Sequence, residues 1–188
     1  MCASGQVAAA DARSVRPRHA KRPGATVNPT KPQGIVVEVG TATVRMDPVG
    51  FAIYADQFLM ASCAIPADGK YSPVPYYLLC RALELILKAL LLARGHSIAG
   101  LKAKFGHNLE ALWNAARAEG LSELIKPLPS TAEADVASAN AYYKGKAFEY
   151  FDFSRWANRY EGLPPLERLR ELTTLVVGKL KSYCISLA

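Results

Sequence analysis

The sequence contains few of the residues that build metal centres and nucleophilic active sites. Its 188 residues include three histidines and four cysteines. No two cysteines stand at C-x-x-C spacing, and no cysteine has a histidine at zinc-ligand spacing. The phosphate-binding loops G-x-x-x-x-G-K-[ST] and G-x-G-x-x-G are absent, as are the H-E-x-x-H and G-x-S-x-G motifs. These absences argue against the common metal, dinucleotide and serine-hydrolase sites, and we expect neither a metal ion nor a cofactor.

Glycine and proline, with 13 and 12 residues, are too scarce for a fibrous or low-complexity chain. Apolar residues make up 51% of the chain and charged residues 21%, which is the composition of a globular protein. A length of 188 residues predicts one domain with some additional chain. Cys63, Cys80 and Cys184 lie within apolar stretches, so we interpret them as small hydrophobic residues of the core.

Acidic residues are scarce in the first part of the chain. Residues 1–48 contain seven basic and three acidic residues, and the net charge of the whole chain is +7. Because residues 1–33 show no sustained hydrophobic period, we expect residues 1–46 to form a disordered basic tail, with one short strand or a hairpin within the β-branched run 34–46. No apolar core of a secretory signal follows these charges, which favours a cytoplasmic protein, and an organelle transit peptide is the alternative. The positive charge favours polyanionic partners.

A helical period begins at Asp47 and continues towards the C-terminus. Asp47-Pro48 is typical of a helix start, because aspartate caps the first turn and proline fits its first position. Further helices are predicted from Ser72-Pro73 to about Gly95, from Ile98 to Lys104, from Asn108 to Gly120, from a Ser130–Glu133 capping box to Tyr143, and from Pro164-Pro165 onward. About five helices with short connections predict an all-α fold, an antiparallel up-and-down bundle over residues 47–188.

The helix predicted after Ser72 is apolar over most of its circumference, so a membrane span is its first alternative interpretation. Arg81, Glu84 and Lys88 argue against that interpretation, because each charge at mid-membrane depth costs about 2.5–3.5 kcal/mol. Their spacings of three and four residues place them on one helix face, with Glu84 and Lys88 in the favourable order for an ion pair. We therefore predict a central bundle helix with a charged seam and no membrane association.

The candidate site residues form a polar set on this apolar scaffold. His107 is either a helix cap or a general acid/base, since histidine titrates near neutral pH. Glu84 and Lys88 are either a stabilising pair or part of a binding site. Arg159 and Tyr160 either bind a phosphate or lock the surface. We predict His107 and Arg159 as candidate catalytic residues, and as candidate binding residues Arg81, Glu84, Lys88, Asn108, Arg155 and Tyr160.

The order of these segments resembles the HEPN superfamily. The resemblance rests on ALELILKALLLARG, on GHNLEALWNAARAEGL after it, on YYKGKAFEYFDFSRWANRY and on a closing amphipathic helix, and it covers about residues 50–185. It implies a small all-helical protein, commonly a homodimer, of the kind found in defence, toxin–antitoxin and RNA-processing systems. Active members are metal-independent endoribonucleases in which an arginine stands four to six residues before a histidine. Within the region of resemblance, no arginine precedes a histidine at that spacing.

Three functions follow as hypotheses. The first is a HEPN-like module that binds RNA, a nucleotide or a partner protein such as an antitoxin, without the family's usual ribonuclease chemistry. The second is a metal-independent endoribonuclease with a rearranged site, in which His107 acts with Arg159 or Arg81. The third is a structural module whose aromatic segment 148–160 contacts another protein.

Overall fold

The computed structural model describes residues 35–39, 42–66, 72–150, 154 and 160–188. Of the basic tail 1–46 that was expected to be disordered, residues 1–34 and 40–41 lie outside the described residues. Strand β1 (Ile35–Val39) pairs antiparallel with β2 (Ala42–Met46), and Ile35 lies opposite Met46 in the ladder. The hairpin expected within residues 34–46 is therefore confirmed, because the two β-branched runs are partners for each other.

All other secondary-structure elements of the described chain are helices, which confirms the all-α prediction. The short helix predicted from Ile98 to Lys104 is confirmed, but a further helix of 4 residues, Leu121–Leu124, was not predicted, so the described residues form more helices than the five or so expected. The helices are α1 (Pro48–Cys63), α2 (Pro73–Ala93), α3 (Ile98–Phe105), α4 (Leu109–Ala118), α5 (Leu121–Leu124), α6 (Ala132–Tyr143) and α8 (Leu166–Ser186).

Local signals explain most helix starts. The Asp47 side chain accepts a hydrogen bond from the backbone N–H of Gly50 at 2.7 Å, which caps α1 as its Asp-Pro sequence predicts. The capping box predicted at Ser130–Glu133 is wrong. Thr131 is the N-cap of α6 and has helical backbone angles, so no side chain caps the helix there. The Glu133 carboxylate instead pairs with Arg117 of α4.

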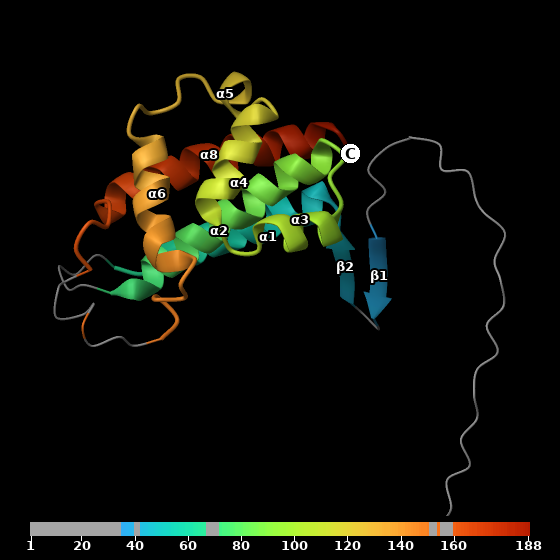
Figure 1. Cartoon of the computed structure of the whole chain (residues 1–188). Coiled ribbons are helices and arrows are strands. Elements are labelled where there is room, and N and C mark those ends of the chain that lie inside the picture. The colour runs from blue at the N-terminus through green and yellow to red at the C-terminus, as the bar shows by residue number, and fades with distance from the viewer. Residues whose placement is uncertain (1–34, 40–41, 67–71, 151–153, 155–159) are drawn as a thin grey trace, which may run out of the picture. The chain divides into compact units, whose positions relative to one another are not determined.

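Helix α2 is the centre of the core. It buries 14 of its 21 residues and packs against α1, α4, α6 and α8 (Figure 1). Such burial on nearly every side requires the apolar circumference seen in its sequence. Each fully buried leucine contributes about 1.5–3 kcal/mol of transfer free energy, so the leucine-rich text of α2 supplies much of the driving force for folding.

The three long helices have defined directions. The Tyr76 hydroxyl, near the start of α2, donates a hydrogen bond to the Pro164 carbonyl just before α8 at 2.9 Å. Arg170, near the start of α8, donates to the Ser62 carbonyl near the end of α1 at 3.3 Å. Lys181, further along α8, pairs with the earlier Asp56 of α1 at 2.6 Å, so α8 passes α1 in the opposite direction. Helices α2 and α8 therefore run parallel to each other, and both are antiparallel to α1, while α4 and α6 lie across α2 (Figure 1). The expected antiparallel up-and-down bundle is thus confirmed only in part, because the direction in which helices far apart in the sequence pack is set by long-range contacts.

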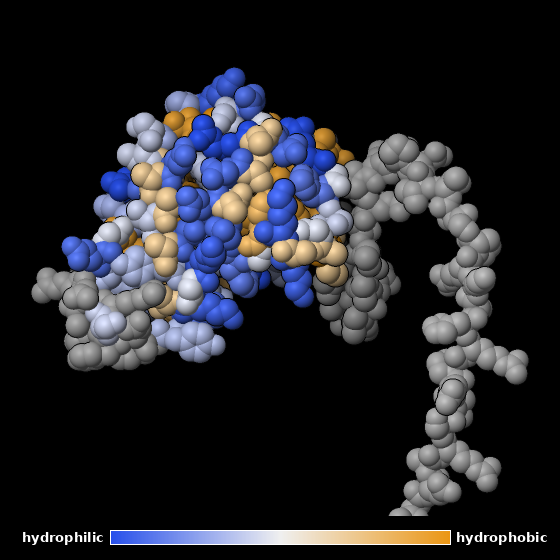
Figure 2. All heavy atoms as spheres, in the orientation of Figure 1, coloured by the Kyte–Doolittle hydropathy of each residue, from blue (hydrophilic) through white to orange (hydrophobic). Residues whose placement is uncertain are grey.

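The surface differs from this apolar interior in its hydropathy. The face shown in Figure 2 is mainly hydrophilic, with hydrophobic residues confined to small areas. No helix among the described residues has the length and apolar character needed to cross a membrane. Cys80 and Cys184 are buried as expected, but the prediction for Cys63 is wrong. Cys63 is exposed, because it is the last residue of α1 and follows the last buried residue of that helix, Ser62.

Candidate functional site

The centre of the candidate site is a buried carboxylate, that of Glu84, whose side chain is 1% exposed. Its Oε1 accepts hydrogen bonds from Lys88 Nζ at 2.6 Å and from Arg81 Nη1 at 2.9 Å. Its Oε2 accepts a hydrogen bond from the Tyr143 hydroxyl at 2.5 Å and lies 3.0 Å from His107 Nδ1. Four polar side chains from three parts of the chain therefore meet on one carboxylate.

The fold brings these groups together in two ways. On α2, spacings of three and four residues place Arg81, Glu84 and Lys88 on one face of the helix. The turn between α3 and α4 then brings His107 over this face. Gly106 has a φ of 53° in that turn, a left-handed conformation that favours glycine, and its carbonyl accepts a hydrogen bond from Lys88 Nζ at 2.9 Å. The turn is thus anchored to the charged seam of α2.

The charges within the cluster follow from its burial and its hydrogen bonds. Burial acts to raise the pKa of Glu84, but hydrogen bonds from Lys88, Tyr143 and His107 outweigh it and hold that pKa below its usual value. Burial and the negative charge of Glu84 raise the pKa of Tyr143. Burial acts to lower the pKa of Arg81, but the charge of Glu84 outweighs this and raises it. The carboxylate is therefore ionised, Arg81 is cationic and the phenol stays protonated.

This assignment fixes the tautomer of His107. An ionised carboxylate only accepts hydrogen bonds, so Nδ1 of His107 must carry the hydrogen that it shares with Glu84. In the neutral ring, Nε2 is then the basic nitrogen, and no group among the described residues forms a hydrogen bond with it. The Tyr143 ring supports the imidazole from the side, edge-on at 6.1 Å between ring centres. The His107 side chain is 49% exposed and lines the cleft described next.

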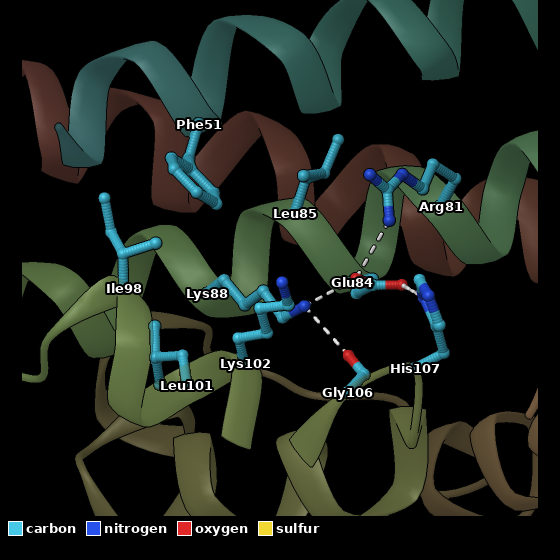
Figure 3. Close-up of a pocket in the computed structure, with 10 residues that line it drawn as sticks. All are labelled: Phe51, Arg81, Glu84, Leu85, Lys88, Ile98, Leu101, Lys102, Gly106 and His107. Carbon is cyan, nitrogen blue, oxygen red and sulfur yellow. Dashed lines mark hydrogen bonds and ion pairs between the residues drawn. The ribbon is translucent and has the colours of Figure 1, made fainter. Parts of the chain in front are cut away.

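The cluster lies along a cleft of about 300 Å³ between α1, α2 and α3. Figure 3 shows Phe51 on one side, the α2 residues along the floor and the α3 residues on the other side. One end is polar, with Arg81, Glu84, Lys88, Lys102 and His107. The other end is apolar, and it is formed by Phe51, Leu85, Ile98 and Leu101. Such a cleft suits a ligand that carries both a negative group and an apolar ring.

Asn108 does not line the cleft. Its side chain is the N-cap of α4 and accepts a hydrogen bond from the backbone N–H of Ala111 at 3.2 Å. The same oxygen accepts a hydrogen bond from Asn140 Nδ2 at 3.2 Å, and Asn140 Oδ1 accepts one from the backbone N–H of Leu109 at 2.8 Å. These bonds fix the residue that follows His107 and so hold the imidazole over Glu84.

The aromatic segment is placed only in part. Tyr160 is 4% exposed and packs with Tyr142 and Phe148, at ring-centre distances of 5.7 and 6.4 Å. It does not line the cleft. Arg155 and Arg159 lie outside the described residues, so the expected pairing of His107 with Arg159 stays a prediction. The described structure does bring His107 and Arg81 together, because both contact the carboxylate of Glu84.

Sequence reasoning missed two residues of α6 that support the site, Asn140 and Tyr143. They stand three residues apart, so both face the same side of the helix. An asparagine one turn before a tyrosine on an otherwise apolar helix face is the signal that could have drawn attention to them. Buried polar side chains need partners, and these two reach the α3–α4 turn and Glu84 respectively.

No protein-family model, curated protein or solved structure matches the chain.

Proposed function

We propose that the protein is a HEPN-like helical module that binds single-stranded RNA at the cleft between α1, α2 and α3. The observation that supports this is the gathering of Arg81, Lys88 and Lys102 around one end of the cleft, where Glu84 is the single carboxylate among the lining residues. Cationic side chains bind phosphates and release counterions, which drives association with RNA. The apolar end then offers Phe51 as a surface on which a base stacks.

Arg81 is the residue best placed to hold a phosphate. Its guanidinium has five N–H donors in a planar fork, more than its neighbours Glu84 and Tyr143 can accept. Its side chain is 29% exposed, so part of that fork is open to a ligand. Glu84 orients the guanidinium but does not neutralise the charge of Arg81 fully, because the same carboxylate also accepts a hydrogen bond from Lys88.

Fluorescence anisotropy with a labelled single-stranded RNA tests this proposal across a salt series. For single strands, log K should fall against log salt with a slope of about −0.7 for each phosphate contacted. Lys102→Ala should weaken binding and make that slope shallower by about 0.7. Lys104→Ala is the matched control, since it lies on the same helix, does not line the cleft, and has its ammonium over the Phe105 ring at 5.1 Å. Equal losses in both variants, or no binding at about 50 mM salt, would contradict the proposal.

A second candidate function, metal-independent RNA cleavage, is favoured by the His107 tautomer. The basic Nε2 would take the proton from a ribose 2′-hydroxyl as its oxygen attacks phosphorus. The 5′-oxygen would leave with a proton from water, giving a 2′,3′-cyclic phosphate and a free 5′-hydroxyl. The Arg81 guanidinium would stabilise the negative charge that develops on the phosphoryl oxygens. Glu84 would hold the imidazole in its reactive tautomer throughout.

Cleavage of RNA in EDTA tests the second candidate. His107→Ala should abolish cleavage, with circular dichroism used to check the fold. His107→Asn is the sharper variant, because its amide keeps a donor for Glu84 where Nδ1 stood but provides no base. Unchanged cleavage in a folded His107→Asn variant would exclude His107 as the base. Loss of cleavage with retained RNA binding would separate catalysis from the binding function.

A further inference from the structure

The polar end of the cleft carries more positive charge than its own carboxylate balances. Arg81 and Lys88 share the single negative charge of Glu84. Lys102 extends from α3 towards Lys88 (Figure 3) and has no carboxylate partner in the described part of the chain. Three cations and one anion leave a surplus of two positive charges around the cleft.

This surplus distinguishes between two kinds of phosphate. A phosphodiester within a chain carries one negative charge, whereas a phosphomonoester carries about 1.5 to 2 near neutral pH and has three strong acceptor oxygens. A single monoester neutralises most or all of the surplus by itself, whereas a single phosphodiester neutralises half of it. Its three terminal oxygens also suit donors that converge from two directions, Arg81 and Lys88 on α2 and Lys102 on α3.

The size of the cleft favours the same ligand. At about 300 Å³ it lies at the lower end of the range for small-molecule sites, about 300–1,000 Å³. One nucleotide-sized group fits such a volume, but a continuous stretch of several nucleotides does not. The apolar end, with Phe51 and Ile98, takes the base of that one nucleotide.

Building on the proposed function, we infer that the cleft recognises a terminal phosphomonoester, either at the end of an RNA strand or on a free mononucleotide. The monoester oxygens contact Arg81, Lys88 and Lys102, and the attached base lies against Phe51. A phosphorylated end thus binds in preference to an internal position of the same strand.

Anisotropy with three RNA probes of one sequence tests this inference, one with a 5′-phosphate, one with a 3′-phosphate and one with hydroxyl groups at both ends. One phosphorylated probe should bind about tenfold more tightly than the hydroxyl-ended probe, which corresponds to about 1.4 kcal/mol. Lys102→Ala should remove most of that preference, and Lys104→Ala should retain it. Competition by AMP but not by adenosine would support a free mononucleotide as ligand, and competition only by a phosphorylated strand would support an RNA end.

The possible failures are distinguishable. Equal binding of all three probes, with a loss in Lys102→Ala, would overturn the terminal-phosphate inference and leave RNA binding at the cleft intact. A preference for a phosphorylated probe that persists unchanged in Lys102→Ala would place the monoester elsewhere and also overturn the inference. Absence of binding by every probe would overturn the proposed function together with the inference.

Discussion

Replacing Glu84 by glutamine is the most informative single change in this protein. The substitution keeps the size of the side chain but removes the charge that Arg81 and Lys88 share. It also places an NH₂ donor where one carboxylate oxygen accepts hydrogen bonds. Because Lys88, Arg81, His107 and Tyr143 all donate to this group, at least one donor loses its acceptor.

The magnitude follows from the exposure of the partners. Breaking a buried charge pair by removing one partner costs about 3–5 kcal/mol. The Lys88 side chain is 12% exposed and bears most of this cost, whereas water screens Arg81 and His107, at 29% and 49%. We therefore expect a loss near the lower end, about 3 kcal/mol. At about 2–4 °C per kcal/mol for a domain of this size, Tm should fall by about 6–12 °C.

Urea denaturation followed by circular dichroism measures the free energy of unfolding of wild type and Glu84→Gln. Asp56→Asn is the matched control, because it also removes the carboxylate of an ion pair between residues of this chain. In that pair, however, the side chains of Asp56 and Lys181 are 36% and 33% exposed. That control should lose less than about 1 kcal/mol. A loss of similar size in both variants would refute the reasoning, since burial would then have no bearing on the energy of the Glu84 cluster.

The stability difference between wild type and Glu84→Gln should shrink as pH falls below about 4. The folded protein holds the pKa of Glu84 below its value of about 4.3 in the unfolded chain, so the unfolded chain takes up the proton first and wild type loses its advantage. Urea midpoints measured between about pH 3 and 7 check this, and a constant difference would contradict it. Asn108→Ala should destabilise the protein by about 1 kcal/mol through loss of the α4 cap, whereas Asn114→Ala, at an exposed position in α4, should not destabilise it in the same denaturation assay. A thiol reagent at neutral pH should modify the exposed Cys63 rapidly, while Cys184, which is 1% exposed and whose pKa is raised mainly by burial to about 11, should react only on unfolding. Peptide mass mapping separates the two thiols, and equal labelling would contradict the packing of α8.

Those parts of the fold that depend on local sequence could be predicted. The Asp47 cap and the apolar circumference of α2 are properties of short segments, and both predicted their helices. Long-range choices could not be predicted in this way. The parallel course of α2 and α8 depends on contacts such as Tyr76 with Pro164, which are 88 residues apart. A long-range contact also explains why the predicted capping box is wrong. Glu133 pairs with Arg117 of α4 and does not cap the N-terminus of its own helix, α6.

In the candidate site, too, local groupings could be predicted from the sequence and long-range contacts could not. Arg81, Glu84 and Lys88 could be grouped from the helical period alone. That His107 contacts Glu84 depends on how the α3–α4 turn folds back over α2, which no spacing in the sequence indicates. Tyr143 was missed because a tyrosine at the end of a helix looks like an ordinary packing residue until its hydroxyl partner is known. Tyr160, predicted as a binding residue, lies in a buried aromatic cluster with Phe148, and its role in binding stays a prediction.

The position of the charged seam on the core helix has an evolutionary consequence. Mutations of Arg81, Glu84 or Lys88 disturb the described helix that buries the most residues, so natural variation there should be strongly constrained. Helix α3 contributes the facing wall but buries only Leu101 and Phe105. Its outward positions can change with little effect on folding. Diversification of ligand preference in descendants of this protein should therefore accumulate on α3, while the seam on α2 is inherited unchanged.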